Sequence, residues 1–208
     1  MKKLVIISFA NLLVISAFTQ NITSSVTYSR GVFTTSVTTT VTASQSAVND
    51  VISKFFTQYK TDLPALFTWA FKGVNLQGEA DKFMIFNVKS HKLGNDGVVR
   101  GVMDMKIIDL GKTYTNVAYS GALTKVKDTP DEIVILYKLY DCQEVIKLAN
   151  ATLKITRTAD KAVTLSLVAD ITLTRFYNML ITRKMFDENL KWRFVNLVKN
   201  FANAVQKR

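Results

Sequence analysis

The chain has 208 residues, of which 48% are hydrophobic and 21% charged, and its formal net charge is +11. This composition is ordinary for a globular protein and is enough for one good core, not clearly for two. A single cysteine, Cys142, excludes a disulfide within the chain, and a single histidine, His91, excludes the usual cysteine–histidine zinc site.

Residues 1–19 have the build of a secretory signal peptide. Lys2 and Lys3 precede an apolar run that Asn11 interrupts and that ends in small residues. The run is short for a membrane span of about 20 residues. We therefore expect cleavage near residues 17–20 and an exported, periplasmic or secreted protein. Loss of the two lysines would lower the charge from +11 to +9. The alternative is an uncleaved N-terminal anchor.

After the signal peptide, residues 20–31 are polar and are interpreted as a segment ahead of a single domain, 32–208. Residues 32–41 are dense in valine and threonine, which predicts the first strand. Ser44 is typical of a helix N-cap and apolar residues follow it at helical spacing. Asp62 predicts a second, short helix, with a proline near its first turn.

Six further strands are predicted between residues 83 and 173, because apolar and polar residues alternate there and turn signals separate the runs. In the first of these strands Phe86 and Val88 face inward, which places His91 on the outer face. The sequence Gly-Asn-Asp-Gly at 94–97 predicts the hairpin turn that follows.

Residues 176–208 predict one long amphipathic helix, with a break or kink near 187–189. Its apolar stripe includes Phe194, Leu197 and Phe201. Its polar, solvent-facing side carries Lys191, Arg193, Asn196 and Lys199.

Together these elements predict an α+β fold, a single curved antiparallel sheet of about seven strands that grips a long C-terminal helix, with two shorter helices after the first strand. Residues 38–44 form a strand that runs straight into the first helix, and Leu63, Pro64 and Trp69 follow. In this stretch, and in element order over residues 32–206, the chain resembles the START and polyketide-cyclase superfamily, the helix-grip fold. A lipocalin-like or other α+β sheet is the main rival.

No group of residues in the sequence is typical of a catalytic site, and we predict a protein that is not an enzyme and needs no metal or cofactor. His91 is interpreted as a surface residue and Cys142 as a buried thiol on an apolar strand. Arg100, Asp104 and Lys106 share one strand face, which a solvated outer surface explains.

The resemblance implies a cavity for a mostly apolar ligand between the sheet and the terminal helix. A filled core is the alternative, because the same apolar spacing predicts both. Tyr114 is an alternative to Tyr119 in the predicted lining. The side chains expected to bind the ligand are Met84, Phe86, Met103, Met105, Tyr119, Phe194, Leu197 and Phe201.

The function expected from these features is an exported, non-enzymatic binding protein for a hydrophobic small molecule or lipid. The alternative is a structural or interaction protein of the cell envelope, with a filled core and a basic surface that contacts anionic lipid or polymer. A third reading, an enzyme of cyclase or hydrolase type, requires at least two polar residues that converge in a cavity. The basic residues are spread along the chain, so nucleic acid is a poor partner.

Overall fold

The computed structural model describes residues 21–73, 84–108, 110–142, 144–159 and 161–206, and its helices and strands form one α+β domain. The strands form one antiparallel sheet in the order β1-β2-β8-β7-β6-β5-β4-β3. The elements are β1 (Thr23–Ser29), β2 (Val32–Thr42), α1 (Gln45–Thr61), α2 (Leu63–Thr68), β3 (Met84–Leu93), β4 (Val99–Ile107), β5 (Lys112–Asp128), β6 (Glu132–Asp141), β7 (Ile146–Ala159), β8 (Ala162–Leu173), α3 (Arg175–Leu180), α4 (Arg183–Asn189) and α5 (Lys191–Gln206).

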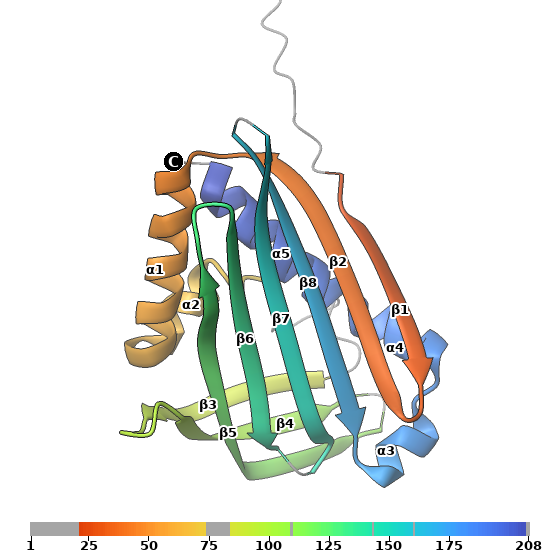
Figure 1. Ribbon diagram of the computed structural model, residues 1–208. Coiled ribbons are helices and arrows are strands. Elements are labelled where there is room, and N and C mark those ends of the chain that lie inside the picture. Colours follow the sequence, from red (N-terminus) through yellow and green to blue (C-terminus); the bar gives the residue numbers. More distant parts are fainter. Residues whose placement is uncertain (1–20, 74–83, 109, 143, 160, 207–208) are drawn as a thin grey trace, which may run out of the picture.

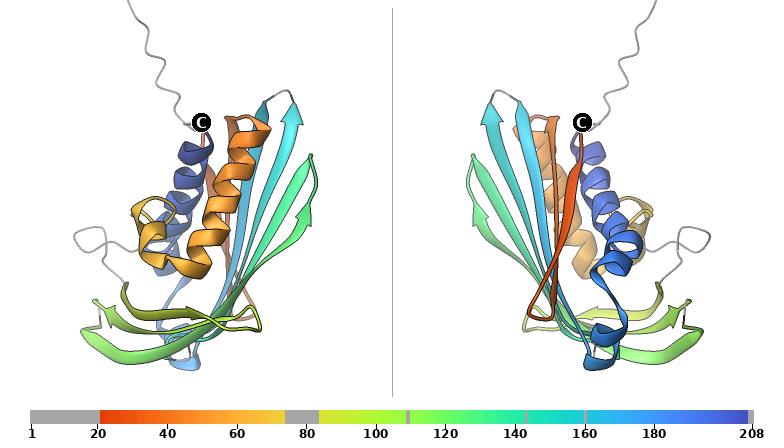
Figure 2. Two further views of the ribbon diagram at one scale, coloured as in Figure 1. Left: turned by 90° about the vertical axis from the view of Figure 1, so that its left-hand side faces the viewer. Right: turned by 90° about the vertical axis from the view of Figure 1, so that its right-hand side faces the viewer.

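The predicted curved sheet around a C-terminal helix is confirmed. Strands β3 to β5 sweep crosswise beneath the long strands β6, β7, β8 and β2, so the sheet forms a deep trough (Figures 1 and 2). Helices α1 and α5 lie side by side on the concave face of this trough. The sheet therefore covers the helices on one side and leaves its convex face to solvent.

The sheet has eight strands where about seven were expected, because residues 23–29 of the predicted polar segment pair with β2 as an edge strand. Val26 is the one buried residue of this strand, so no apolar alternation marks it in the sequence. The two shorter helices consequently follow the second strand. Their predicted caps are confirmed: Ser44 Oγ accepts from the amide of Ala47, and Asp62 Oδ1 accepts from the amide of Ala65, each at 3.1 Å.

The C-terminal segment is three helices where one long helix was predicted. Ile181 has extended backbone angles after α3, and Thr182 begins α4 by accepting a hydrogen bond from the amide of Met185 at 3.2 Å. The predicted break near 187–189 agrees with the end of α4 at Asn189. Only α5 is gripped by the sheet, while α3 and α4 close the lower end of the trough (Figure 1).

Two clusters of buried side chains result from this division. The upper cluster packs α1 and α5 against the middle of the sheet through residues such as Ile52, Phe55 and Phe201. The lower cluster packs α3 and α4 against β1, β2 and β4, with the Phe33 and Phe186 rings stacked at 4.4 Å. No helix among the described residues has the length and apolar content that crossing a membrane requires.

Two bulges, one in β3 and one in β5, lie on either side of β4. Each changes which side chains of its strand face into the trough. Lys89 is the extra residue on β3, between paired residues Val88 and Ser90. The register also shifts between β4 and β5, where Asn116 has a left-handed φ of 58°. Asp104 of β4 links the two sites, because its carboxylate lies 2.7 Å from Lys89 Nζ and accepts from the amide of Asn116 at 2.9 Å. A charged cluster on the convex face thus fixes which side chains point into the trough.

Candidate ligand cavity

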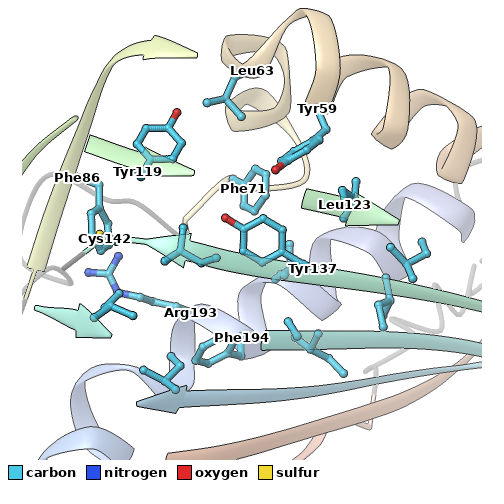
Figure 3. A pocket seen from close by; sticks show the side chains of 18 of the residues that line it. Tyr59, Leu63, Phe71, Phe86, Tyr119, Leu123, Tyr137, Cys142, Arg193 and Phe194 are labelled. Carbon is cyan, nitrogen blue, oxygen red and sulfur yellow. The ribbon is translucent and has the colours of Figure 1, made fainter. Parts of the chain in front are cut away.

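A cavity of about 380 Å³ lies between the concave face of the sheet and helices α1 and α5 (Figure 3). Small-molecule pockets in proteins have volumes of about 300–1,000 Å³, so this space is large enough for a ligand. Most of its lining is aliphatic or aromatic, and no acidic side chain is among the described residues that line it. The cavity lies between the two buried clusters and is lined by members of both.

One side of the cavity, here called the apolar wall, consists of Ile135, Leu153 and Leu167 on the sheet and Val198 and Phe201 on α5. The three sheet residues are direct cross-strand partners, so they form one row across β6, β7 and β8. Phe201 is 1% exposed, and its ring lies 4.9 Å from that of Phe55 between centroids. Regular alternation on regular strands produces this wall.

The other side, the polar wall, consists of Tyr59, His91, Tyr119 and Tyr137. His91 Nε2 lies 2.7 Å from the backbone oxygen of Tyr59, and because a carbonyl only accepts, this nitrogen donates. In the neutral ring, Nδ1 is then the acceptor for the hydroxyl of Tyr119 at 2.8 Å. A longer contact of 3.2 Å to the oxygen of Ser90 competes for the same hydroxyl proton. The imidazole thereby connects α1, β3 and β5.

Two glycines make room for the tyrosines of this wall. A Cβ atom at Gly101 would lie 2.2 Å from the oxygen of Ser90 and 2.5 Å from the Tyr119 ring, which is far inside van der Waals contact. At Gly121 the clash is milder, since a Cβ atom would lie 2.9 Å from the oxygen of Lys138 and 3.1 Å from the Tyr137 hydroxyl. The aromatic rings therefore lie close to backbone that has no side chain of its own, and their position depends on these glycines.

The three tyrosines of the polar wall and Cys142 remain neutral at physiological pH. Burial raises the pKa of Tyr119 to about 12, and it also raises the pKa values of Tyr59 and Tyr137. Burial, with a smaller contribution from Glu144, raises the pKa of the Cys142 thiol to about 12. The tyrosines consequently offer hydroxyl groups as hydrogen-bond donors and acceptors, and the thiol is a poor nucleophile.

Arg193 brings a permanent positive charge to the cavity lining. It is 6% exposed, and its guanidinium carbon lies 5.9 Å from the Phe86 ring centroid and 4.8 Å from that of Trp192. In Figure 3 the guanidinium lies next to Phe86 and Cys142 at one end of the cavity. It is the one side chain with a fixed charge among the described lining residues.

The structure brings most of the predicted ligand-binding side chains together. Met105 is fully buried in the lower cluster beside the Cys142 thiol and does not line the cavity. The side chain of Met84 lies outside the described part of the chain. Tyr119, not Tyr114, lines the cavity, because Tyr114 bonds to the hydroxyl of Tyr177. The predicted residues that line the cavity are Phe86, Met103, Tyr119, Phe194, Leu197 and Phe201.

The prediction that His91 lies on the outer surface is wrong, and the bulge at Lys89 is the reason. The extra residue shifts the alternation, so Val88 and His91 both face the cavity. Two successive polar residues, Lys89 and Ser90, are the sequence signal that could have revealed it.

The placement of Arg193 on the solvent-facing side is also wrong. The apolar stripe of α5 is where it was predicted, since Val198 and Phe201 are buried. Arg193 lies beside that stripe on the first turn, and its guanidinium packs over the Phe86 and Trp192 rings. Asn196 is half-buried and binds the oxygen of Gly73 at 3.0 Å, although it was expected to be wet, whereas Lys199 is exposed as predicted. Phe194 and Leu197 are half-buried where near-complete burial was expected, and both line the cavity.

Within the described residues, no three or more His, Cys, Asp or Glu side chains are grouped as metal ligands would be. Cys142 is buried as predicted and lies on the cavity lining. Arg100 and Asp104 are on the convex face, where Asp104 supports the two bulges and Arg100 pairs with Asp96 at 2.6 Å. The outer-face interpretation of this charged strand is therefore consistent with the structure.

Comparison with known proteins identifies the fold. The sequence matches no family model, and no curated protein sequence matches it. The Zhui aromatase/cyclase from Streptomyces sp. R1128 has a TM-score of 0.52 at 11% identity, over 85% of this chain and 95% of that one. A conserved protein from Geobacillus kaustophilus has a TM-score of 0.51 at 11% identity, over 84% and 95%. A START superfamily protein from Mycobacterium smegmatis has a TM-score of 0.48 at 14% identity, over 84% and 97%. The first two likenesses show that the chain has the fold of that aromatase/cyclase, the predicted helix-grip fold.

Proposed function

We propose that this chain is an exported protein that binds a hydrophobic small molecule or lipid between its sheet and α5. The cavity of about 380 Å³ carries this proposal, because its lining offers apolar surface on nearly every side. A filled core, as in the alternative of a purely structural envelope protein, would leave no such space.

The two walls indicate what kind of molecule would fit. An apolar skeleton would lie along Leu153, Leu167 and Phe201, whose side chains carry no polar atom. A hydroxyl or carbonyl group would face Tyr119 and Tyr137 and exchange hydrogen bonds with their neutral hydroxyl groups. The ligand expected from this arrangement is mainly apolar, with a polar group toward one side.

Ligand extraction followed by mass spectrometry of the purified native protein tests the proposal. We expect a co-purified apolar molecule in the wild type and its loss in Ala151→Trp, because this residue lines the cavity and the indole would occupy the space. Lys154→Trp, on the exposed face of the same strand, is the matched control and should retain the molecule. Equal retention by both variants, or no bound molecule and no thermal shift with any lipid or sterol, would contradict the proposal.

A second candidate function, proton-transfer catalysis on an apolar substrate, is favoured by one observation. His91 and Tyr119 converge on the cavity at 2.8 Å, which meets the requirement for two polar groups in one site. Against it, both ring nitrogens of His91 are already engaged and no acid lines the described cavity. We therefore propose binding without turnover as the first function.

Comparing the bound molecules of wild type and Tyr119→Phe separates the two functions. A catalyst would release or hold product in the wild type and hold a different molecule, the substrate, in the variant. A binding protein would hold the same molecule in both.

The exported location is part of the proposal and has its own test. It is supported by the signal-like residues 1–19. Intact mass of the protein recovered from its natural host should correspond to cleavage near residues 17–20. A mass that includes residues 1–19 would favour an N-terminal anchor.

A further inference from the structure

Exposed apolar side chains gather at one end of the molecule, on α3 and on the adjoining turn between β4 and β5. Met179 is 75% exposed. Lys112 lies at the start of β5, and its Nζ atom is 4.5 Å from the Phe176 ring centroid, so it connects the turn to α3. Figures 1 and 2 show α3 next to this end of the sheet. We call this group the apolar tip: Ile108, Leu110, Phe176, Met179 and Leu180.

The apolar tip is presented by a fixed element. Tyr177 of α3 is 1% exposed in the lower cluster, and its hydroxyl lies 2.6 Å from that of Tyr114 on β5. Asn178 accepts a hydrogen bond from Tyr28 of β1 at 3.2 Å. One face of α3 is therefore anchored on two sides, and the opposite face exposes Phe176, Met179 and Leu180 to solvent.

Basic residues flank the apolar tip along the chain, with one acidic residue, Asp109, between Ile108 and Leu110 in the sequence. Residues 174–184 contain Arg175, Arg183 and Lys184 and no acidic residue. Lys112 adds a further charge beside Phe176. Aromatic and aliphatic side chains flanked by lysine and arginine are typical of surfaces that bind the interface of an anionic bilayer, where each basic residue near the surface contributes about 1 kcal/mol.

We propose that the apolar tip docks this protein on an anionic lipid bilayer. Phe176, Met179 and Leu180 insert among the lipid headgroups, and the basic residues face the lipid phosphates. This interaction surface goes beyond the proposed ligand-binding function and does not depend on an occupied cavity, because the lower cluster separates the two.

Sedimentation with vesicles tests the docking. All variants carry the same N-terminus, verified by intact mass, and vesicles of phosphatidylcholine mixed with phosphatidylglycerol are compared with vesicles of phosphatidylcholine alone. We expect the wild type to bind the mixed vesicles and to dissociate as salt is added. Met179→Ser should weaken binding about tenfold, since an inserted side chain is lost. Lys112→Gln and Arg175→Gln should weaken it about fivefold each.

Val126→Ser is the matched control, because Val126 is 53% exposed on the β5 end far from α3. It should bind as the wild type does, and unchanged thermal melting of every variant verifies the fold. Binding that is equal on both kinds of vesicle, or that Met179→Ser leaves unchanged, overturns the proposal. Self-association that disappears in Met179→Ser, without vesicle binding, would assign the tip to a second copy of the chain and overturn it as well.

Discussion

The apolar and polar walls of the cavity differ in how the backbone positions them. Ile135, Leu153 and Leu167 lie in one row of regular cross-strand pairs, so simple alternation aims them inward. His91 faces inward only because of the bulge at Lys89, and Tyr119 lies beyond the irregular pairing of β4 with β5. Two of the groups that can recognise polar features of a ligand, His91 and Tyr119, are thus found where the strands depart from regularity.

The first prediction breaks the apolar wall. Phe201→Ala removes a ring that is 1% exposed and packed against Phe55 and Trp69. Unfolding free energy should fall by up to about 3–5 kcal/mol, the cost in a closely packed core, and by less where the ring borders the cavity. Urea denaturation measures it. Lys199→Ala, exposed on the same helix, should change stability by no more than about 0.5 kcal/mol. Equal, negligible effects of the two substitutions would show that the sheet does not grip α5.

The second prediction displaces the polar wall through its backbone. Gly101→Ala puts a Cβ atom 2.2 Å from the oxygen of Ser90, so the Tyr119 ring or strand β3 must move. We expect a loss of about 1–3 kcal/mol in unfolding free energy, the usual cost of overpacking. Ala118→Ser, on the exposed face of β5, is the control and should melt like the wild type. A Gly101→Ala protein of full stability would mean that the two strands tolerate a wider separation.

The third prediction removes one hydrogen bond from the polar wall and leaves its shape. Tyr119→Phe deletes the hydroxyl that His91 Nδ1 contacts, at a cost of about 1 kcal/mol in denaturant melts. Tyr140→Phe, whose side chain is 46% exposed, should cost nothing measurable. Affinity for a bound molecule with a polar group should fall in Tyr119→Phe, while affinity for a pure hydrocarbon should not. Equal losses for both molecules would contradict the division of roles between the walls.

The inward rows of the apolar wall were largely predictable from the sequence, whereas of the polar wall only Tyr119 was predicted. Leu165, Leu167 and Ala169 alternate with exposed or half-buried residues along an unbroken strand, and β7 shows the same pattern, whereas the sequence of β6 is apolar on both faces. A bulge adds one residue without changing the composition, so the period of two gives the wrong face for His91. Arg193 was misplaced for a different reason: its charge favours a solvent-facing position, but its guanidinium packs over the Phe86 and Trp192 rings.

The smallest effect concerns the convex face that supports the polar wall. A hydrogen bond from Lys89 and another from the amide of Asn116 lower the pKa of the Asp104 carboxyl. The ionised form is therefore favoured by folding, and its stabilisation is present above the unfolded pKa of about 3.9 and lost as the pH falls below it. Asp104→Asn should lower the melting temperature slightly at pH 7, and the difference from wild type should vanish in acid. Asp131→Asn, an exposed turn residue, should show no such difference.

Two asparagines of α5 bear on how fast a ligand would exchange. Asn200 Nδ2 lies 3.0 Å from the oxygen of Ala70 and 2.7 Å from that of Lys72, and Asn196 binds the oxygen of Gly73. These bonds fasten the backbone that carries Phe71, a lining residue, to the gripped helix. Any path that leads out past Phe71 must break them and can re-form them afterwards. These bonds would consequently affect the residence time of a ligand more than its affinity. Weakening them should speed ligand binding and ligand release together.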